Sequence, residues 1–188
     1  MRAISSALPL DELKWGPLVL TAGKLEELWE KTKQFPQVFA DFSRGSYEAF
    51  AAKFFVPQNV FIDIGPGLGL AAGIATKPGL DTVLHLVMFD RRLRGREPLF
   101  KDIMRYFFQH LKLRRMTAMI AEDCVTAAKL VGRLGFKHEG CMKKSILRGG
   151  KLLDTHIFGI LSEELDAPQV SAPAEGSIAD TATIVGAG

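Results

Sequence analysis

The chain has 188 residues, of which 47% are hydrophobic and 24% are charged, and its net charge is +3. These values indicate one globular domain with its own core. Two cysteines, Cys124 and Cys141, are too few for a disulfide scaffold. The longest weakly polar run, residues 64–76, is shorter than the roughly 20 residues of a membrane-spanning helix. The N-terminal residues lack the apolar core of a signal peptide, so we expect a cytoplasmic protein.

The first part of the chain predicts a short strand and two helices. Residues 17–22 form the expected strand, and residues 24–35 have the periodicity of an amphipathic helix that Pro36 ends. Ser46 is a typical N-cap for a second helix over residues 47–55. Three aromatic side chains of this second helix form an apolar stripe that we assign to the core: Phe50, Phe54 and Phe55.

A glycine-rich stretch follows and allows two interpretations. Residues 60–64 predict a strand, and residues 67–76 predict either a small-residue strand or a helix. The pattern Asp-x-Gly-x-Gly-x-Gly from Asp63 to Gly69 resembles the first motif of S-adenosylmethionine-dependent methyltransferases, with Asp90 in place of the ribose-binding acid. The following segment is short and ends at Lys77-Pro78-Gly79, which disfavours that remote alternative. The other interpretation is a turn and a strand packed closely against its neighbour.

The second part of the chain alternates strands with helices. The predicted strands cover residues 81–89, 115–121, 136–145 and 154–161, and the predicted helices cover residues 99–111 and 125–134. Gly135 ends the second of these helices, and Arg148-Gly149-Gly150 joins the last two strands. From residue 166 onward the composition shifts to Ala, Pro, Ser, Gly and Thr. We therefore expect a domain over residues 1–165 and a tail over residues 166–188 that is either disordered or ordered only by a protein partner.

A basic loop, Asp90 to Pro98, connects the strongest predicted strand to a helix. Between Arg91 and Arg115 there are nine Lys or Arg residues against two acidic ones. A helix N-terminus presents unpaired N–H groups and a positive dipole end, so this loop predicts an anion site. The ligand would be a nucleotide-like cofactor or nucleic acid, and the alternative is a solvated basic turn.

From Thr82 onward the sequence resembles the GCN5-related N-acetyltransferase (GNAT) superfamily, especially its ribosomal-protein-alanine-acetyltransferase-like branch. The family's central strand carries a valine and leads through a Q/R-x-x-G-x-G/A loop into a helix. Val87 and the run Arg92-Leu93-Arg94-Gly95-Arg96-Glu97 match this pattern. The second signature, Leu-Gly-Phe-x-x-Glu-Gly, matches Leu134 to Gly140, and Gly150 to Asp154 is similar to the family's closing Gly-x-x-x-Asp.

The resemblance implies an α/β (α+β) GNAT fold with a central mixed, mostly antiparallel sheet flanked by helices. It also implies acetyl-coenzyme A as the co-substrate and an amine as the acceptor. The family binds the cofactor with residues at these positions: Val87, Met88, Arg92, Leu93, Arg94, Gly95, Arg96 and Glu97.

Three positions depart from the family pattern. Glu97 replaces the small residue that lets the backbone approach the phosphates, and Val131 replaces the tyrosine that protonates the departing thiolate. The nearest replacement acid is Cys124, where the family often has asparagine. His85 is the expected general base, because it is the one histidine inside the central strand, and Glu139 is the reserve candidate. A packed histidine is the structural alternative for His85.

Three functions therefore remain open from the sequence. The first is an N-acetyltransferase that acts on a protein N-terminus, a lysine or a small amine. The second is a catalytically inactive GNAT-fold module, for example a phage virion or assembly component in a host cytoplasm. The third, nucleic-acid binding through residues 91–115, is weaker. Oligomerisation is compatible with all three, and nothing indicates a membrane or a metal ion.

Overall fold

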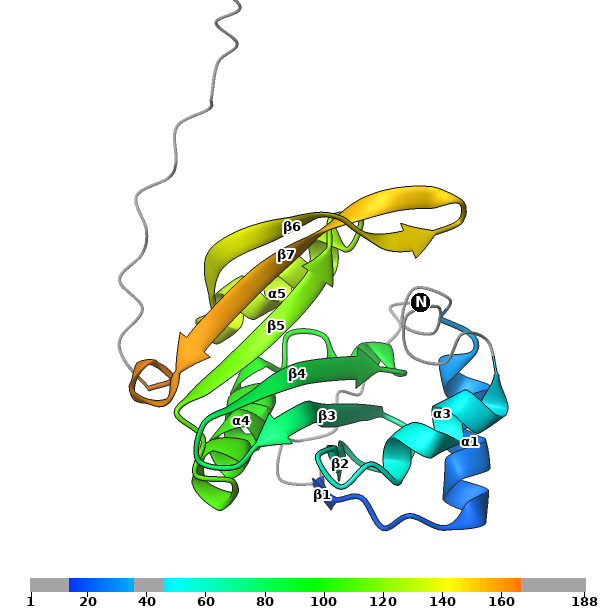
Figure 1. The fold of residues 1–188 in the computed structure, drawn as a ribbon. Coiled ribbons are helices and arrows are strands. Elements are labelled where there is room, and N and C mark those ends of the chain that lie inside the picture. Colours follow the sequence, from blue (N-terminus) through cyan, green and yellow to red (C-terminus); the bar gives the residue numbers. More distant parts are fainter. Residues whose placement is uncertain (1–13, 36–45, 167–188) are drawn as a thin grey trace, which may run out of the picture.

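The computed structural model describes residues 14–35 and 46–166, and their strands form one seven-stranded sheet (Figure 1). The sheet order is β1-β2-β3-β4-β5-β7-β6. The strands are β1 (Gly16–Pro17), β2 (Val60–Asp63), β3 (Gly69–Lys77), β4 (Asp81–Met88), β5 (Arg115–Ala121), β6 (Lys137–Arg148) and β7 (Lys151–Leu161). Strands β4 and β5 are parallel, and the other neighbouring pairs are antiparallel. This confirms the predicted mixed, mostly antiparallel sheet.

The described residues contain four α-helices, which pack on both faces of the sheet. They are α1 (Ala22–Thr32), α3 (Tyr47–Phe54), α4 (Glu97–His110) and α5 (Val125–Leu134). Helices α1 and α3 pack with Phe61 and Leu70 on one face, and α4 and α5 pack with Ile62 and Ala71 on the other. Neighbouring residues of a strand point to opposite faces, which explains this division. We call the two sides the α1/α3 face and the α4/α5 face.

The predicted helix ends at Ser46 and Gly135 are confirmed. The Ser46 hydroxyl accepts a hydrogen bond from the backbone N–H of Ala49 at 3.3 Å, which satisfies a donor in the first turn of α3. Gly135 has φ +104°, the left-handed conformation that ends α5. Helix α5 and strand β5 have the predicted bounds.

The first elements differ from the prediction. The expected strand over residues 17–22 is wrong, because β1 is only Gly16–Pro17 and α1 already begins at Ala22. The cause is Thr21, whose hydroxyl accepts a hydrogen bond from the N–H of Lys24 at 3.1 Å and caps the helix. The helix ends at Thr32 and not at residue 35, and Pro36 lies outside the described residues.

The β6–β7 hairpin is longer than predicted and is bent. Its two strands continue to a two-residue turn in which Gly149 has φ +55° and Gly150 has φ +78°. Such a turn requires two residues with positive φ, which glycine adopts without strain. The pairing shifts between Met142 and Ile146, and Lys144 there has φ +49°. This irregularity bends the hairpin over the end of β5 (Figure 1).

The glycine-rich stretch forms a turn and a strand, as the second interpretation predicted. Strand β3 begins at Gly69 and pairs antiparallel with both β2 and β4. The methyltransferase alternative is contradicted, because its motif requires a helix after the glycines and a parallel sheet. A Cβ atom on Gly69 would lie 2.7 Å from the backbone oxygen of Val87. The glycine is needed for this close approach of β3 to β4.

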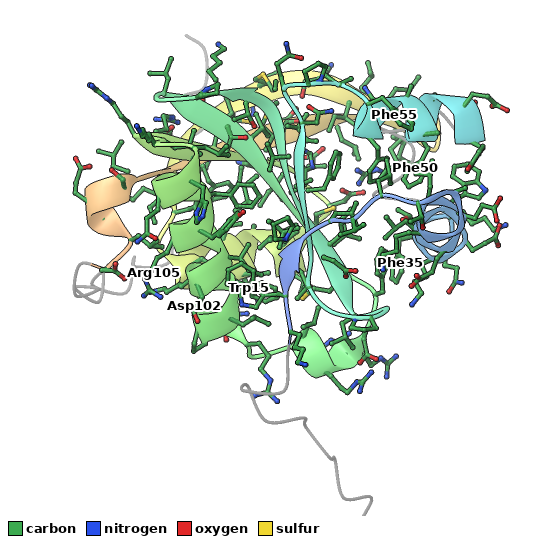
Figure 2. All side chains as sticks on the ribbon, turned by 90° about the horizontal axis from the view of Figure 1, so that it is seen from below. Trp15, Phe35, Phe50, Phe55, Asp102 and Arg105 are labelled. Atoms are coloured by element: carbon green, nitrogen blue, oxygen red, sulfur yellow. The ribbon has the colours of Figure 1, made fainter. Side chains whose placement is uncertain are left out.

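Contacts of α4 hold both ends of the described chain. Trp15 packs edge-on against Tyr106 with 5.6 Å between ring centroids, and Figure 2 shows it beside the helix. Arg105 binds Asp102 and also Asp166, the first residue of the predicted tail. Residues 167–188 lie outside the described part of the chain. None of the described helices is long and apolar enough to cross a membrane.

Replacing Gly69 by alanine is expected to destabilise the fold. The new methyl group would meet the carbonyl of Val87 and the buried Leu93 side chain, 2.8 Å away, and a backbone carbonyl in a sheet cannot move easily. Overpacking of this kind costs about 1–3 kcal/mol. Gly140→Ala is the control, because a Cβ atom there meets nothing within 4 Å, and it should change stability by less than about 0.5 kcal/mol. Urea unfolding measures both free energies, and equal values would contradict the packing argument.

Candidate active site

The parallel strands β4 and β5 pair over only three residues and then diverge. Their register runs from Asp81 opposite Arg115 to Val83 opposite Thr117. Beyond that point β4 stays paired with β3 as far as Met88, and β5 stays paired with β7 as far as Ala121. The two facing edges therefore carry backbone N–H and C=O groups with no partner on the opposite strand. Such groups in the middle of a sheet can bind a ligand inserted between the strands.

A cavity of about 260 Å³ occupies this gap and reaches both faces of the sheet. Strands β4 and β5 form its walls with residues 84–87 and 118–121. On the α1/α3 face it is lined by Thr32, Phe50, Phe54, Phe61, Leu70 and Ala72. The remaining lining residues come from α5 and the β6–β7 hairpin: Cys124, Ala127, Leu130, Val131, Ile146 and Arg148.

His85 lines the cavity from the centre of β4. It lies opposite Ala72 in the sheet, and opposite residues of a strand pair point to the same face, which here is the α1/α3 face. The side chain is half-buried, and burial lowers the pKa of the imidazole below its usual range. The imidazole of the predicted base is therefore neutral. It lines the same cavity as the aromatic side chains of the α1/α3 face.

Cys124 lines the other side of the cavity, immediately before α5. Its Sγ lies 3.6 Å from Nη1 of Arg148 and 3.4 Å from a carboxylate oxygen of Asp123. Burial raises the pKa of the thiol, and the hydrogen bond from Arg148 opposes this shift only in part. Asp123 is bound to Arg148 at 2.5 Å, which lowers the pKa of that carboxyl group. Cys124 is thus a protonated thiol, and Val131 lies on the same wall.

Glu139, the reserve candidate for the base, lies away from this cavity. Its carboxylate binds both terminal nitrogens of Arg115 at 2.5 and 3.1 Å, and this pairing lowers the pKa of the carboxyl group. Arg115 is the first residue of β5, whereas the cavity lies along residues 118–121. Glu139 therefore supports the closed end of the strand pair and does not face the gap.

The basic loop follows β4 and turns into α4. The Asp90 carboxylate accepts hydrogen bonds from the backbone N–H and the guanidinium of Arg92, each at 2.8 Å. Leu93 is fully buried and anchors the loop to the core. Gly95 has φ +72°, and a Cβ atom there would meet nothing within 4 Å. In the described residues, neither Arg91 nor Arg94 belongs to an ion pair.

Glu97, the residue that departs from the family pattern, is the first residue of α4. Its carboxylate accepts a hydrogen bond from Nε of Arg133 on α5 at 2.7 Å. This bond, together with one from its own backbone N–H, lowers the pKa of the carboxyl group. The negative charge is thus turned toward α5 and compensated there. It does not stand alone at the helix N-terminus, where it would repel a phosphate.

Val87 and Met88, the two strand residues of the predicted cofactor site, have different surroundings. Val87 lines the cavity and pairs with Leu70. Met88 pairs with Gly69 at the end of β4 and packs against the core on the α4/α5 face. Of the predicted residues, the structure brings His85, Val87 and Cys124 together at one cavity, with the loop adjacent to it.

No protein-family model matches the chain, and no curated protein matches it in sequence. Solved structures do match. A chimera of Vibrio cholerae spermidine N-acetyltransferase SpeG and hSSAT has a TM-score of 0.67 and 17% identity, over 81% of this chain and 99% of that chain. A SpeG point mutant has a TM-score of 0.65 and 16% identity, over 82% and 98%. A dodecameric SpeG structure has a TM-score of 0.63 and 16% identity, over 80% and 94%.

The chain has the GNAT fold. At this level of identity the likeness concerns the fold alone, and the predicted fold class is confirmed.

Two parts of the cavity were not predicted from the sequence. Arg148 was assigned to a turn, but the bent hairpin brings it over Cys124. Phe50 and Phe54 were assigned to the core, and they also line the cavity. The same assignment is wrong for Phe55, which is exposed. The aromatic stripe itself is visible in the sequence, but its relation to the gap depends on how α3 packs on β2 and β3.

Alkylation should show that Cys124 is protonated at neutral pH. A raised pKa leaves less thiolate at a given pH, and the thiolate is the reacting species. The rate of carbamidomethylation of Cys124 by iodoacetamide should keep rising above about pH 8.5, the ordinary pKa of a thiol. Peptide mass spectrometry on a Cys141→Ser background measures the rate. A rate that levels off near pH 7 would contradict the assignment.

Proposed function

We propose that the protein is an N-acetyltransferase that transfers an acetyl group from acetyl-coenzyme A to an amine. The observation that carries the proposal is the gap between β4 and β5, because its edges have no partner on the opposite strand, a neutral histidine lines it, and β4 leads through the basic loop to the N-terminus of α4. The fold neighbours are spermidine N-acetyltransferases, so the same reaction class is known on this architecture.

The loop residues Arg92 to Glu97 and the first turn of α4 fit the pyrophosphate of the co-substrate. The exposed Gly95 leaves room for a close approach of the phosphates, and Arg91 and Arg94 add positive charge. Glu97 does not oppose this fit, because Arg133 compensates its carboxylate. When bound, acetyl-coenzyme A would supply the acyl thioester, with its pantetheine arm along Val87 in the gap.

His85 would accept the proton that the amine loses as it attacks. Its imidazole is neutral, half-buried and directed to the α1/α3 face, opposite the face on which α4 and α5 pack. A backbone N–H on the facing edge of β4 would polarise the thioester carbonyl. Positioning of the two reactants between the strands would supply most of the rate.

Cys124 would return a proton to the departing sulfur. The thiol has a raised pKa and lies on the cavity wall at the start of α5. It replaces the tyrosine that the family uses, whose position Val131 occupies on the same wall. Arg148 and Asp123 hold Cys124 in place, and solvent water would return the proton to its thiolate.

A catalytically inactive GNAT-fold module is the second candidate. Val131 favours it, since a valine cannot donate a proton at the place where the family has its acid. We also propose an oligomeric assembly, because one fold neighbour is described as dodecameric. A cytoplasmic location, a phage origin and a partner for the tail remain expectations from the sequence.

Calorimetric titration with acetyl-coenzyme A separates the two candidates. We expect saturable binding, and the double variant Arg91→Ala/Arg94→Ala should weaken it about tenfold or more, since each charge-assisted contact to a phosphate contributes about 1.5–3 kcal/mol. Arg114→Ala is the control, because this exposed arginine immediately precedes β5 at the closed end of the β4–β5 pair, whereas the basic loop follows the open end of β4. Absence of heat at millimolar ligand would remove the acetyltransferase proposal and leave the inactive module.

The pH dependence of kcat at saturating amine tests His85. Burial lowers its pKa, so the base stays neutral through pH 7, and kcat should fall only below about pH 6.5, the ordinary value. His85→Gln should lower kcat about 100-fold and remove this acidic limb. His110→Gln is the control, because His110 stacks on Tyr106 at the surface of α4. Wild-type kcat in His85→Gln would exclude His85 as the base.

A further inference from the structure

We propose that the acceptor is a small primary amine with one positive charge and an apolar, aromatic-sized body, and not a polyamine. The inference rests on the proposed function and narrows its acceptor. It follows from the shape and charge of the cavity on the α1/α3 face, where His85 faces the incoming amine.

Aromatic rings form this part of the cavity. Phe54 stacks on Phe61 with 4.3 Å between ring centroids, and it packs on Phe50 at 5.0 Å. Leu70 and Ala72 complete the wall from β3. Figure 2 shows Phe50 in the space between α3 and α1. Such a surface binds an apolar or aromatic group by dispersion and by excluding water.

Charge on the cavity wall disfavours a second ammonium group. Among the described lining residues the titratable side chains are His85, Cys124 and Arg148, and none of them is a carboxylate. Arg148 is the charged group of this lining and is positive, and the nearby Asp123 is already bound to it. A polyamine would have to bury at least one further ammonium group among phenylalanines without a counter-charge, which is strongly unfavourable.

A single amine fits this environment. Burial in apolar surroundings lowers the pKa of an amine and so favours the neutral nucleophile, and His85 can take the one proton that must leave. The size is also suitable: a cavity of about 150 Å³ is enough for benzene, and this one is about 260 Å³. The rest of the cavity volume can hold the acetyl group of acetyl-coenzyme A.

Binding of 2-phenylethylamine and of spermidine, measured without turnover, tests the inference. Trp29 packs on Phe50 at 5.5 Å between ring centroids, so its fluorescence reports on this part of the cavity. A Trp15→Phe background removes the other tryptophan signal. In the presence of coenzyme A, 2-phenylethylamine should bind saturably and at least about tenfold more tightly than spermidine, the difference that one uncompensated polar group produces.

Phe54 and Phe55 are a matched pair for mutation. Phe54 lines the cavity, whereas its neighbour Phe55 is 70% exposed. Phe54→Ala should weaken 2-phenylethylamine binding about tenfold, and Phe55→Ala should leave it unchanged. Phe54→Glu adds the missing carboxylate and should shift the preference toward spermidine, with Phe55→Glu as the control. If Phe54→Glu fails to fold, Phe54→Ala still tests whether the Phe54 ring contributes to binding of 2-phenylethylamine.

The outcomes separate this inference from the proposed function. If acetyl-coenzyme A binds and spermidine is preferred, or neither amine binds, the inference is overturned and the acetyltransferase proposal stands. If acetyl-coenzyme A does not bind but 2-phenylethylamine binds in a Phe54-dependent manner, the function falls while the assigned ligand class holds. Equal binding of 2-phenylethylamine to Phe54→Ala and to the wild type overturns the inference in either case.

Discussion

The divergence of β4 from β5 is the constraint on which the rest of this structure depends. The pair is closed firmly at one end, where the backbone N–H groups of Arg114 and Arg115 both donate to the carbonyl of Leu80. The Thr117 hydroxyl, which donates to the Asp81 carboxylate, strengthens the same end. At the other end each strand is fixed by its outer neighbour, β3 or β7. The gap is therefore held open by the sheet itself and needs no flexible loop.

Compensation of charge around the gap follows a consistent pattern. Glu97 is paired with Arg133, Asp123 with Arg148, and Glu139 with Arg115. His85 and Cys124 face the cavity, and burial favours the neutral form of both. The cavity wall therefore holds one group that can accept a proton and one that can donate a proton, on opposite sides of the sheet. Positive charge is concentrated where the loop meets α4, outside the cavity.

The sequence predicts the parts of this site that depend on strong local signals. Strand β5 and helix α5 have the predicted bounds. In the sequence, the apolar run of β5 and the helical spacing of apolar residues in α5 are each followed by residues that end the element. The loop after β4 was identified from its arginines and Gly95. Glu139 was the reserve candidate because it lies on a predicted strand next to the central one, but the pairing register places it beside Arg115. Local pattern alone does not give that register.

Long-range packing decides the features that the sequence could not predict. The bend in the β6–β7 hairpin places Arg148 over Cys124, and it arises from an irregular register between Met142 and Ile146. The phenylalanines of α3 have the same helical spacing whether they fill a core or line a cavity. They do both here, because Phe50 is buried and also borders the gap.

Under the proposed function, the acceptor side of the cavity depends on side chains, whereas the cofactor side depends on the backbone. The gap and the loop are properties of the backbone, and the chain shares its fold with spermidine N-acetyltransferases at 15–17% identity. The wall on the α1/α3 face consists of side chains, and these can change without disturbing the strands. A wall of phenylalanines next to a neutral histidine selects a different amine from a wall with carboxylates. The neighbours therefore inform the fold, while under the proposed function Phe50, Phe54 and Phe61 would determine which amine binds.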